Sequence, residues 1–388
     1  MLGRGKLNII IDGQFGSTGK GLLSSYIGTK FDIDVAVTNG SPNAGHSFYV
    51  DDKKHIAHHL PVTGILNENA IIYLCSGAII NPTILLQELD EFKCSDRLYI
   101  HPRVAVVEKQ DLDEEKEGSV KKIASTQSGV GSALVRKINR SASLAEDNEI
   151  LRPFVKEFDL NKHLQQKDWV VMEVPQGFDL SINSGLSYPH CTSREITISA
   201  ALSDAQVHPG DLGSVTVCIR TFPIRVGHII EKNKKVGDSG PFYPDSTETS
   251  WANIGVEEEL TTVTGRVRRV ATFSMLQYKR MLDALRPDYI LLNFTNYLSE
   301  KELSELLHKL PEVSHISDGP KVENVKDIGT KMTIYDANAL ACSYMVLWEH
   351  NQKNKNKKIM SVLESRICFS LPYLMRLLEC AKVLLLKD

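Results

Sequence analysis

Short apolar runs of strand length recur along the chain and constrain its fold more than any other feature. Seven of them are nearly continuous and rich in β-branched residues: 7–12, 34–39, 70–75, 97–102, 168–174, 213–220 and 289–294. Such runs are typical of strands that are buried on both faces, as in a parallel sheet. Helix-like segments separate several of these runs, at 19–31, 81–92 and 274–285. We therefore predict an α/β fold with a mainly parallel central sheet flanked by helices.

Two segments do not fit this alternation. Residues 109–122 are densely charged, and we expect a solvated surface helix or loop there. Residues 350–360 are polar and basic, and residues 377–388 are strongly apolar. We expect a surface linker followed by a docked C-terminal helix or a disordered tail, with a membrane-surface helix as the alternative.

Charge and cysteine usage exclude several classes of partner. The net charge of −3 provides no basic field for nucleic acid or for an anionic membrane. No apolar run reaches the length of a membrane span, and the first residues lack the apolar core of a signal peptide. The 7 cysteines are scattered and form no CxxC pair, which favours free thiols in a reducing compartment. We therefore expect a cytoplasmic protein that binds neither nucleic acid nor membrane.

A glycine-rich loop, "GQFGSTGKG" at 13–21, follows the first predicted strand and precedes the first predicted helix. Backbone N–H groups of such a loop and of a helix N-terminus attract anions, and Lys20 adds a positive charge for phosphate. The usual P-loop pattern GxxxxGK[ST] is not met, because Gln14 replaces its first glycine and Gly21 follows Lys20. The segment is therefore a phosphate loop of another lineage or a glycine-rich turn.

A second motif, "PNAGHSF" at 42–48, contains Asn43 and His46 after a predicted strand. A lone histidine is more often structural, but the two motifs together resemble GQWGDEGKGK and NAGHT of the adenylosuccinate synthetase family. Further segments resemble the family in the same order, at 125–140, 172–194, 259–269, 290–296 and 316–321. The family joins aspartate to C6 of a purine nucleotide and consumes a nucleoside triphosphate. The resemblance implies a synthetase domain over 1–328 with a phosphate site of the family's type, and a C-terminal extension of unknown role over 329–388.

The resemblance also implies roles for individual positions. The catalytic set is Ser17, Lys20, His46 and Gln176. The triphosphate set is Gly16, Ser17, Thr18, Gly19, Lys20, Gly21, Asn293, Ser317, Gly319 and Pro320. The nucleoside monophosphate set is Ser17, Asn43, Ser125, Thr126, Arg140, Gln176 and Thr192. The aspartate set is Thr264, Gly265, Arg266 and Arg268. Ser17 and Gly45 match ligands of Mg²⁺, and Arg140 matches an arginine that crosses a dimer interface, so a homodimer is expected.

Two departures from the family motifs bear on the substrates. The family has aspartate at the position of Ser17, where the carboxylate accepts the purine N1 proton and helps to bind Mg²⁺. A serine hydroxyl is no comparable base, but it is smaller and leaves room for the 2-amino group of guanine. The sequence FGSTGKG is similar to a phage-type branch that uses dGMP on the way to 2-aminoadenine. Asn293 replaces an aspartate that reads guanine, and its carboxamide suits adenine, although it could simply cap a strand end.

We therefore expect a ligase that joins L-aspartate to C6 of dGMP, with ATP or dATP and Mg²⁺, through a 6-phosphoryl intermediate. One alternative is a synthetase that acts on IMP with GTP. The other is a catalytically silent regulator that binds purine nucleotides. A P-loop nucleic-acid ATPase is disfavoured by the unmatched loop pattern and by the net charge.

Overall fold

The computed structural model describes residues 1–118, 123–232, 234–261 and 265–329. The expectations for residues 350–360 and 377–388, and the predicted role of Thr264, lie outside these residues. None of the described helices is long and apolar enough to cross a membrane.

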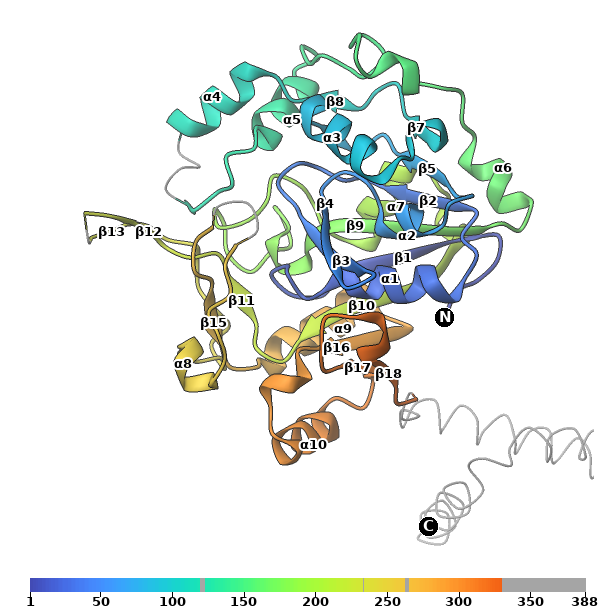
Figure 1. Cartoon of the computed structure of the whole chain (residues 1–388). Helices are drawn as coiled ribbons and strands as arrows, with labels where there is room; N and C mark the ends of the chain where they lie inside the picture. The colour runs from blue at the N-terminus through green and yellow to red at the C-terminus, as the bar shows by residue number, and fades with distance from the viewer. Residues whose placement is uncertain (119–122, 233, 262–264, 330–388) are drawn as a thin grey trace, which may run out of the picture. The chain divides into compact units, whose positions relative to one another are not determined.

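A nine-stranded sheet forms the centre of the described chain, in the order β18-β17-β16-β10-β1-β9-β2-β5-β7 (Figure 1). Its strands are β1 (Lys6–Asp12), β2 (Val35–Thr38), β5 (Ile71–Leu74), β7 (Leu98–Ile100), β9 (Trp169–Gly177), β10 (Leu212–Arg220), β16 (Tyr289–Asn293), β17 (His315–Ser317) and β18 (Val325–Asp327). Every neighbouring pair is parallel except β17 and β18. All seven predicted strands lie in this sheet, which confirms the predicted fold class.

The helices are α1 (Lys20–Lys30), α2 (Val62–Leu66), α3 (Pro82–Phe92), α4 (Lys109–Glu117), α5 (Val130–Ile138), α6 (Leu160–Gln165), α7 (Ile198–Ala205), α8 (Trp251–Ile254), α9 (Met275–Leu285) and α10 (Glu300–Lys309). The three predicted helices are confirmed as α1, α3 and α9. Local sequence sets where two of them begin. The Asn81 side chain accepts hydrogen bonds from two amides of α3, and Ser274 accepts one from the Gln277 amide of α9.

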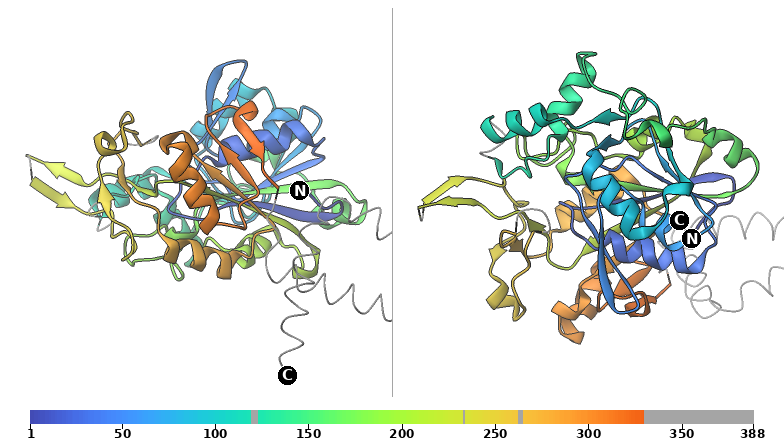
Figure 2. Two further views of the ribbon diagram at one scale, coloured as in Figure 1. Left: turned by 90° about the horizontal axis from the view of Figure 1, so that it is seen from below. Right: turned by 45° about the horizontal axis from the view of Figure 1, so that its top comes forward.

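Smaller strands form hairpins and short ladders around the sheet. They are β3 (His46–Val50), β4 (Lys53–Ala57), β6 (Ile79–Ile80), β8 (Ala105–Val106), β11 (Ile224–Arg225), β12 (Ile229–Glu231), β13 (Lys234–Gly237), β14 (Glu248–Thr249) and β15 (Arg269–Ala271). The β12–β13 hairpin projects away from the sheet (Figures 1 and 2).

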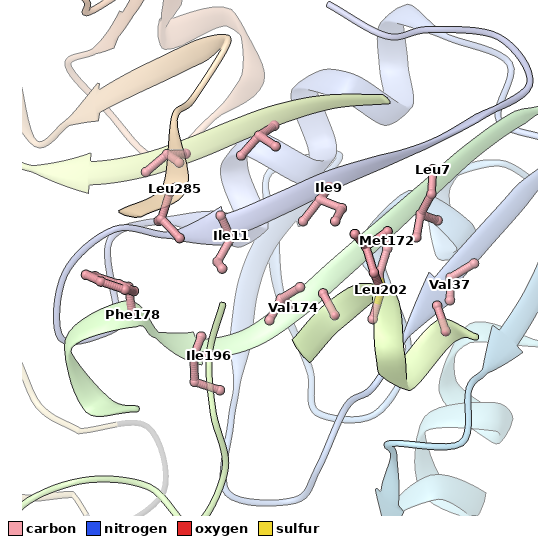
Figure 3. Packing of buried hydrophobic residues seen from close by; sticks show 14 of the residues in the cluster. Leu7, Ile9, Ile11, Val37, Met172, Val174, Phe178, Ile196, Leu202 and Leu285 are labelled. Carbon is pink, nitrogen blue, oxygen red and sulfur yellow. The ribbon is translucent and has the colours of Figure 1, made fainter. Parts of the chain in front are cut away.

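Apolar side chains cover both faces of the sheet. Ile9 and Ile11 of β1 belong to a cluster that contains Leu202 of α7 and Leu285 of α9 (Figure 3). Ile10, between them, points to the opposite face, in a cluster with several side chains of α1. Alternate residues of one strand therefore serve two cores, which explains why the strand sequences are continuously apolar.

The charged segment after residue 108 is only partly a solvated surface. It forms α4 as far as Glu117, but Asp111 and Glu115 are buried. Asp111 pairs with Arg136 at 2.6 Å, and Glu115 accepts hydrogen bonds from the amides of Gly129 and Gly131 at the start of α5. The expectation of a solvated helix is wrong for these two residues, because a basic side chain and a helix N-terminus stabilise their burial.

Candidate active site

The Asp12 side chain, at the end of β1, holds the predicted phosphate loop, residues 13–21, in place. This fully buried carboxylate accepts hydrogen bonds from the amides of Gln14 (2.9 Å), Gly16 (3.2 Å) and Thr18 (3.3 Å), and from the Thr18 hydroxyl (2.5 Å). The amides of Gly16 and Thr18 therefore face Asp12 rather than a ligand. The helix N-terminus that follows, beginning at Lys20, is left to receive an anion.

The Lys20 side chain lies against this loop and is only 5% exposed. Its Nζ donates to the backbone oxygen of Gln176 at 3.1 Å and lies 3.7 Å from Asp12 Oδ2. Gln176 is the last residue but one of β9, so the ammonium group joins the carboxyl ends of two adjacent strands. The Lys20 ammonium group, held beside the loop in this way, is placed to bind a phosphate.

Glycine is required on both sides of Lys20. A Cβ at Gly19 would lie 1.9 Å from Asn293 Nδ2, and a Cβ at Gly21 would lie 2.1 Å from the backbone oxygen of Ser47. Gly19 also has a φ of 94°, which other residues rarely adopt. Close packing of β3 on α1 therefore explains why the usual P-loop serine or threonine is absent after the lysine.

A cavity of about 490 Å³ opens above the loop. Ten of the predicted site residues line it: Ser17, Gly19, Lys20, Gly21, Gly45, His46, Arg268, Asn293, Gly319 and Pro320. These residues come from segments that are far apart in the sequence. Gly16, Thr18 and Ser317 do not line the cavity. Gly16 and Thr18 lie in the phosphate loop, and Ser317 ends β17, where its hydroxyl donates to the Gly319 oxygen at 2.8 Å.

Ser17 is exposed at the edge of this cavity, with a φ of 54°. Its backbone oxygen accepts a hydrogen bond from Arg220 Nη1 at 3.1 Å. Arg220 is fully buried, binds both carboxylate oxygens of Glu259 and stacks on the Phe294 ring at 4.0 Å. Sequence reasoning missed Arg220 and Glu259, although a basic residue at the end of the predicted strand 213–220 was a readable signal.

The imidazole of His46 is 11% exposed and lines the cavity. Its Nδ1 lies 4.0 Å from Glu173 Oε2, and its buried Nε2 has no hydrogen-bond partner in the described chain. Burial, together with the positive charge of Lys20, holds the pKa of His46 well below its ordinary value. The ring is therefore neutral near pH 7, with a nitrogen available to a ligand.

Asn293 ends β16 and is almost completely buried against the cavity. Its Oδ1 accepts from the Phe294 amide at 2.8 Å, and its Nδ2 donates to the Thr18 oxygen at 3.2 Å. A carboxamide can form up to four hydrogen bonds, so one acceptor and one donor position remain. Asn293 thus caps the strand end and keeps the capacity to contact a base.

The residues predicted to bind the monophosphate do not line this cavity, apart from Ser17. Ser125 and Thr126 precede α5, where the Ser128 hydroxyl donates to Thr126 Oγ1 at 2.8 Å. A Cβ at Gly131 in α5 would lie 3.7 Å from Ser193, which places the Thr192 segment beside the same helix N-terminus. Arg140 is exposed, just beyond the end of α5. Asn43 is half-buried in the loop after β2.

The predicted aspartate-binding residues lie on the segment between Glu259 and β15. Arg268 lines the cavity, and burial lowers its pKa to about 10, so its guanidinium stays charged. Arg266 Nη1 is buried without a hydrogen-bond partner in the described chain. Gly265 is exposed, with a φ of 63°. Two arginines on one short segment, one of them with an unpaired nitrogen, suit a dicarboxylate.

Several known proteins are similar to this chain over most of its length. The adenylosuccinate synthetase family model matches residues 9–148 and 142–303. The N6-succino-2-amino-2′-deoxyadenylate synthase of Salmonella phage PMBT28 is 33% identical over 80% of this chain and 90% of its own length. The adenylosuccinate synthetase of Thermococcus onnurineus is 32% identical over 68% of this chain and 76% of its own length. The structure of the cyanophage S-2L succinoaminodeoxyadenylate synthetase, bound to dGMP and to dATP as an energy donor, superposes with a TM-score of 0.75 at 32% identity. It covers 87% of this chain and 99% of that chain.

Proposed function

This chain belongs to the adenylosuccinate synthetase family, and we propose that it joins L-aspartate to C6 of dGMP at the expense of ATP or dATP. The products are N6-succinyl-2-amino-2′-deoxyadenylate, ADP or dADP, and phosphate. Identity alone does not select this reaction, because phage enzymes and an archaeal adenylosuccinate synthetase match at similar levels. The chemistry of the site therefore has to distinguish the dGMP reaction from the IMP reaction.

Ser17 is the observation that carries the proposal. The family motif has a carboxylate at this position, and here the cavity receives a short hydroxyl instead. Asp12 does not replace the missing carboxylate, because it is fully buried and its oxygens accept four hydrogen bonds from the phosphate loop. A small hydroxyl favours a guanine, whose 2-amino group would crowd an aspartate that holds N1–H.

The reaction starts when purine N1 loses its proton, either to an oxygen of the γ-phosphate or to a water held by Ser17, and the γ-phosphoryl group passes from the triphosphate to O6. This transfer converts a poor leaving group into a good one. Lys20 and the N-terminus of α1 hold the transferred group. The neutral His46 ring, in the tautomer that carries its proton on Nε2, donates to O6 and stabilises the negative charge that develops there. The Ser17 hydroxyl and the Gly45 carbonyl line the same cavity and are oxygen ligands of the kind that Mg²⁺ prefers. A magnesium ion held there would neutralise phosphate charge.

The second step is attack by the aspartate amine on C6, which expels the phosphate. Arg266 and Arg268 supply forked donors for the two carboxylates. Arg220 supports them indirectly, because it holds Glu259 at the start of their segment and the Ser17 backbone at the same time. The amine therefore approaches a purine that is fixed by the phosphate loop.

The assembly and the compartment are part of the proposal. Arg140 follows a helix whose Val135 and Ile138 are 54% and 66% exposed. An apolar helix face next to a predicted interface arginine supports a homodimer in which Arg140 contacts the monophosphate of the neighbouring site. The substrates are nucleotides and aspartate, so the reaction belongs to the cytoplasm, that of the host cell if the chain is phage-encoded.

A substrate matrix tests the proposal. The purified protein is incubated with aspartate and Mg²⁺ while dGMP, GMP or IMP is combined with ATP, dATP or GTP. The succinyl nucleotide is identified by mass spectrometry. We expect the highest kcat/KM with dGMP and an adenine triphosphate, and His46→Ala, purified in parallel, controls for host enzyme. Turnover of IMP with GTP alone would identify an ordinary adenylosuccinate synthetase, and nucleotide binding without turnover would identify a regulator.

A further inference from the structure

A buried arginine outside the predicted site reaches the loop that carries Asn43. Arg194 donates to the backbone oxygens of Gly77 (2.5 Å) and Asn39 (2.9 Å), and to the Ser41 hydroxyl (3.2 Å). Ser41 in turn donates to Asn43 Oδ1 at 2.8 Å. A chain of hydrogen bonds therefore runs from Arg194, two residues after Thr192, to the Asn43 carboxamide.

The direction of each bond in this chain follows from the protons that are available. A guanidinium only donates, so the Ser41 oxygen accepts from Arg194. Ser41 is fully buried, and its single hydroxyl proton needs an acceptor, which Asn43 Oδ1 provides. With Oδ1 directed to Ser41, the Asn43 Nδ2 group is turned away from it. Nδ2 forms no hydrogen bond within the described chain.

We propose that Arg194 is a positioning residue that fixes the Asn43 carboxamide as a hydrogen-bond donor to the bound nucleotide. This inference rests on the proposed function, because it concerns the monophosphate site of that reaction. The atom that receives the bond is an acceptor of the nucleotide, either a purine O6 or N7 or a phosphate oxygen. The Asn43 Nδ2 group cannot accept a hydrogen bond from an N–H group of the base.

The burial of Arg194 supports a dedicated role. Only 9% of the residue is exposed, and all its hydrogen bonds in the described chain go to uncharged oxygens. The carboxylate of Asp204 acts on it from farther away and accepts a bond from Asn39 Nδ2 at 2.7 Å. Burial of a cation without a direct ion pair costs stability, so an apolar side chain would serve better if filling space were the only task.

The test compares Arg194→Met, Ser41→Ala and their double variant, with dGMP, IMP and ATP as the varied substrates. We expect each single variant to raise the KM for the monophosphate about 10- to 100-fold, with kcat and the KM for ATP changed less than about threefold. The double variant should lose no more than the Arg194→Met variant, because both changes break one chain of bonds. Arg194→Lys should recover part of the loss, since an ammonium group still donates to Ser41.

Arg97→Met is the matched control. Arg97 also gives its hydrogen bonds to backbone oxygens, those of Gly64, Asn67 and Ala70, but none of these residues belongs to the predicted site. It should lower thermal stability without changing the KM for the monophosphate. The inference is overturned if Arg194→Met behaves like this control, or if the losses in the double variant add. A raised KM for IMP, in a protein that does not use dGMP, would support the inference and overturn the proposed substrate.

Discussion

Ser17 combines two properties that are separate in most binding loops. Its backbone is held firmly, with a left-handed φ of 54° and a carbonyl bound by the buried Arg220. Its side chain, in contrast, is exposed and forms no hydrogen bond in the described chain. The backbone at position 17 is therefore fixed, while the side chain is free to contact a ligand. This combination makes the position suited to select a substrate.

Ser17→Asp tests this at the scale of one residue. The larger, charged side chain should crowd the 2-amino group of dGMP and repel the γ-phosphate, while it restores the base that the wider family uses on IMP. We expect the ratio of kcat/KM for dGMP over IMP to fall at least about tenfold, and the loss reads as a transition-state free energy. Ser17→Ala separates the loss of the hydroxyl from the gain of the charge. If the ratio of kcat/KM for dGMP over IMP is unchanged in Ser17→Asp, position 17 does not select the substrate.

At the scale of elements, the site depends on the contact between α1 and β3. Gly21 in the first turn of α1 lies so close to the Ser47 backbone that any Cβ would collide with it. The same contact places His46, which begins β3, next to Lys20, which begins α1. The two motifs recognised in the sequence are therefore halves of one structural unit.

Gly21→Ala should separate α1 from β3. We expect a loss of about 1–3 kcal/mol in the free energy of unfolding, typical of an overpacked site, and a raised KM for ATP. Gly28→Ala in the same helix is the control, because its nearest neighbour, at 3.3 Å, is the end of the Asn67 side chain. Thermal unfolding and ATP kinetics on both variants check the prediction. Equal KM values for ATP would show that the contact does not position the loop.

At the scale of the whole molecule, the sheet was predictable from sequence because its strands are buried on both faces and therefore read as continuous apolar runs. The motif residues of the phosphate loop and of the His46 segment could be predicted to meet, since both follow strands of a parallel sheet. The bonds of Arg220 with Glu259 and of Arg194 with Ser41 could not, because each joins residues far apart in the chain. The burial of Glu115 was missed for a similar reason: it depends on the N-terminus of another helix.

The proposed dimer also belongs to this scale. If Arg140 completes the neighbouring site, Lys20→Ala and Arg140→Ala should each be nearly inactive alone. When the two variants are mixed, dissociated and allowed to reassociate, hybrid dimers form. In each hybrid dimer one active site carries both substitutions and the other active site carries neither. We expect recovery to about a quarter of the native activity, from random pairing of equal amounts. Sedimentation of the single variants checks that both still dimerise, and no recovery in mixed dimers would place Arg140 within its own site.

The central prediction is that the γ-phosphoryl group passes to purine O6 before the aspartate amine attacks C6 and displaces the phosphate. The most direct measurement uses dGMP labelled with ¹⁸O at O6, with unlabelled ATP, aspartate and water, and follows the label by mass spectrometry. The account predicts that the ¹⁸O appears in inorganic phosphate in amounts equal to the succinyl nucleotide formed. Phosphate without the label, alongside formation of the succinyl nucleotide, would contradict it.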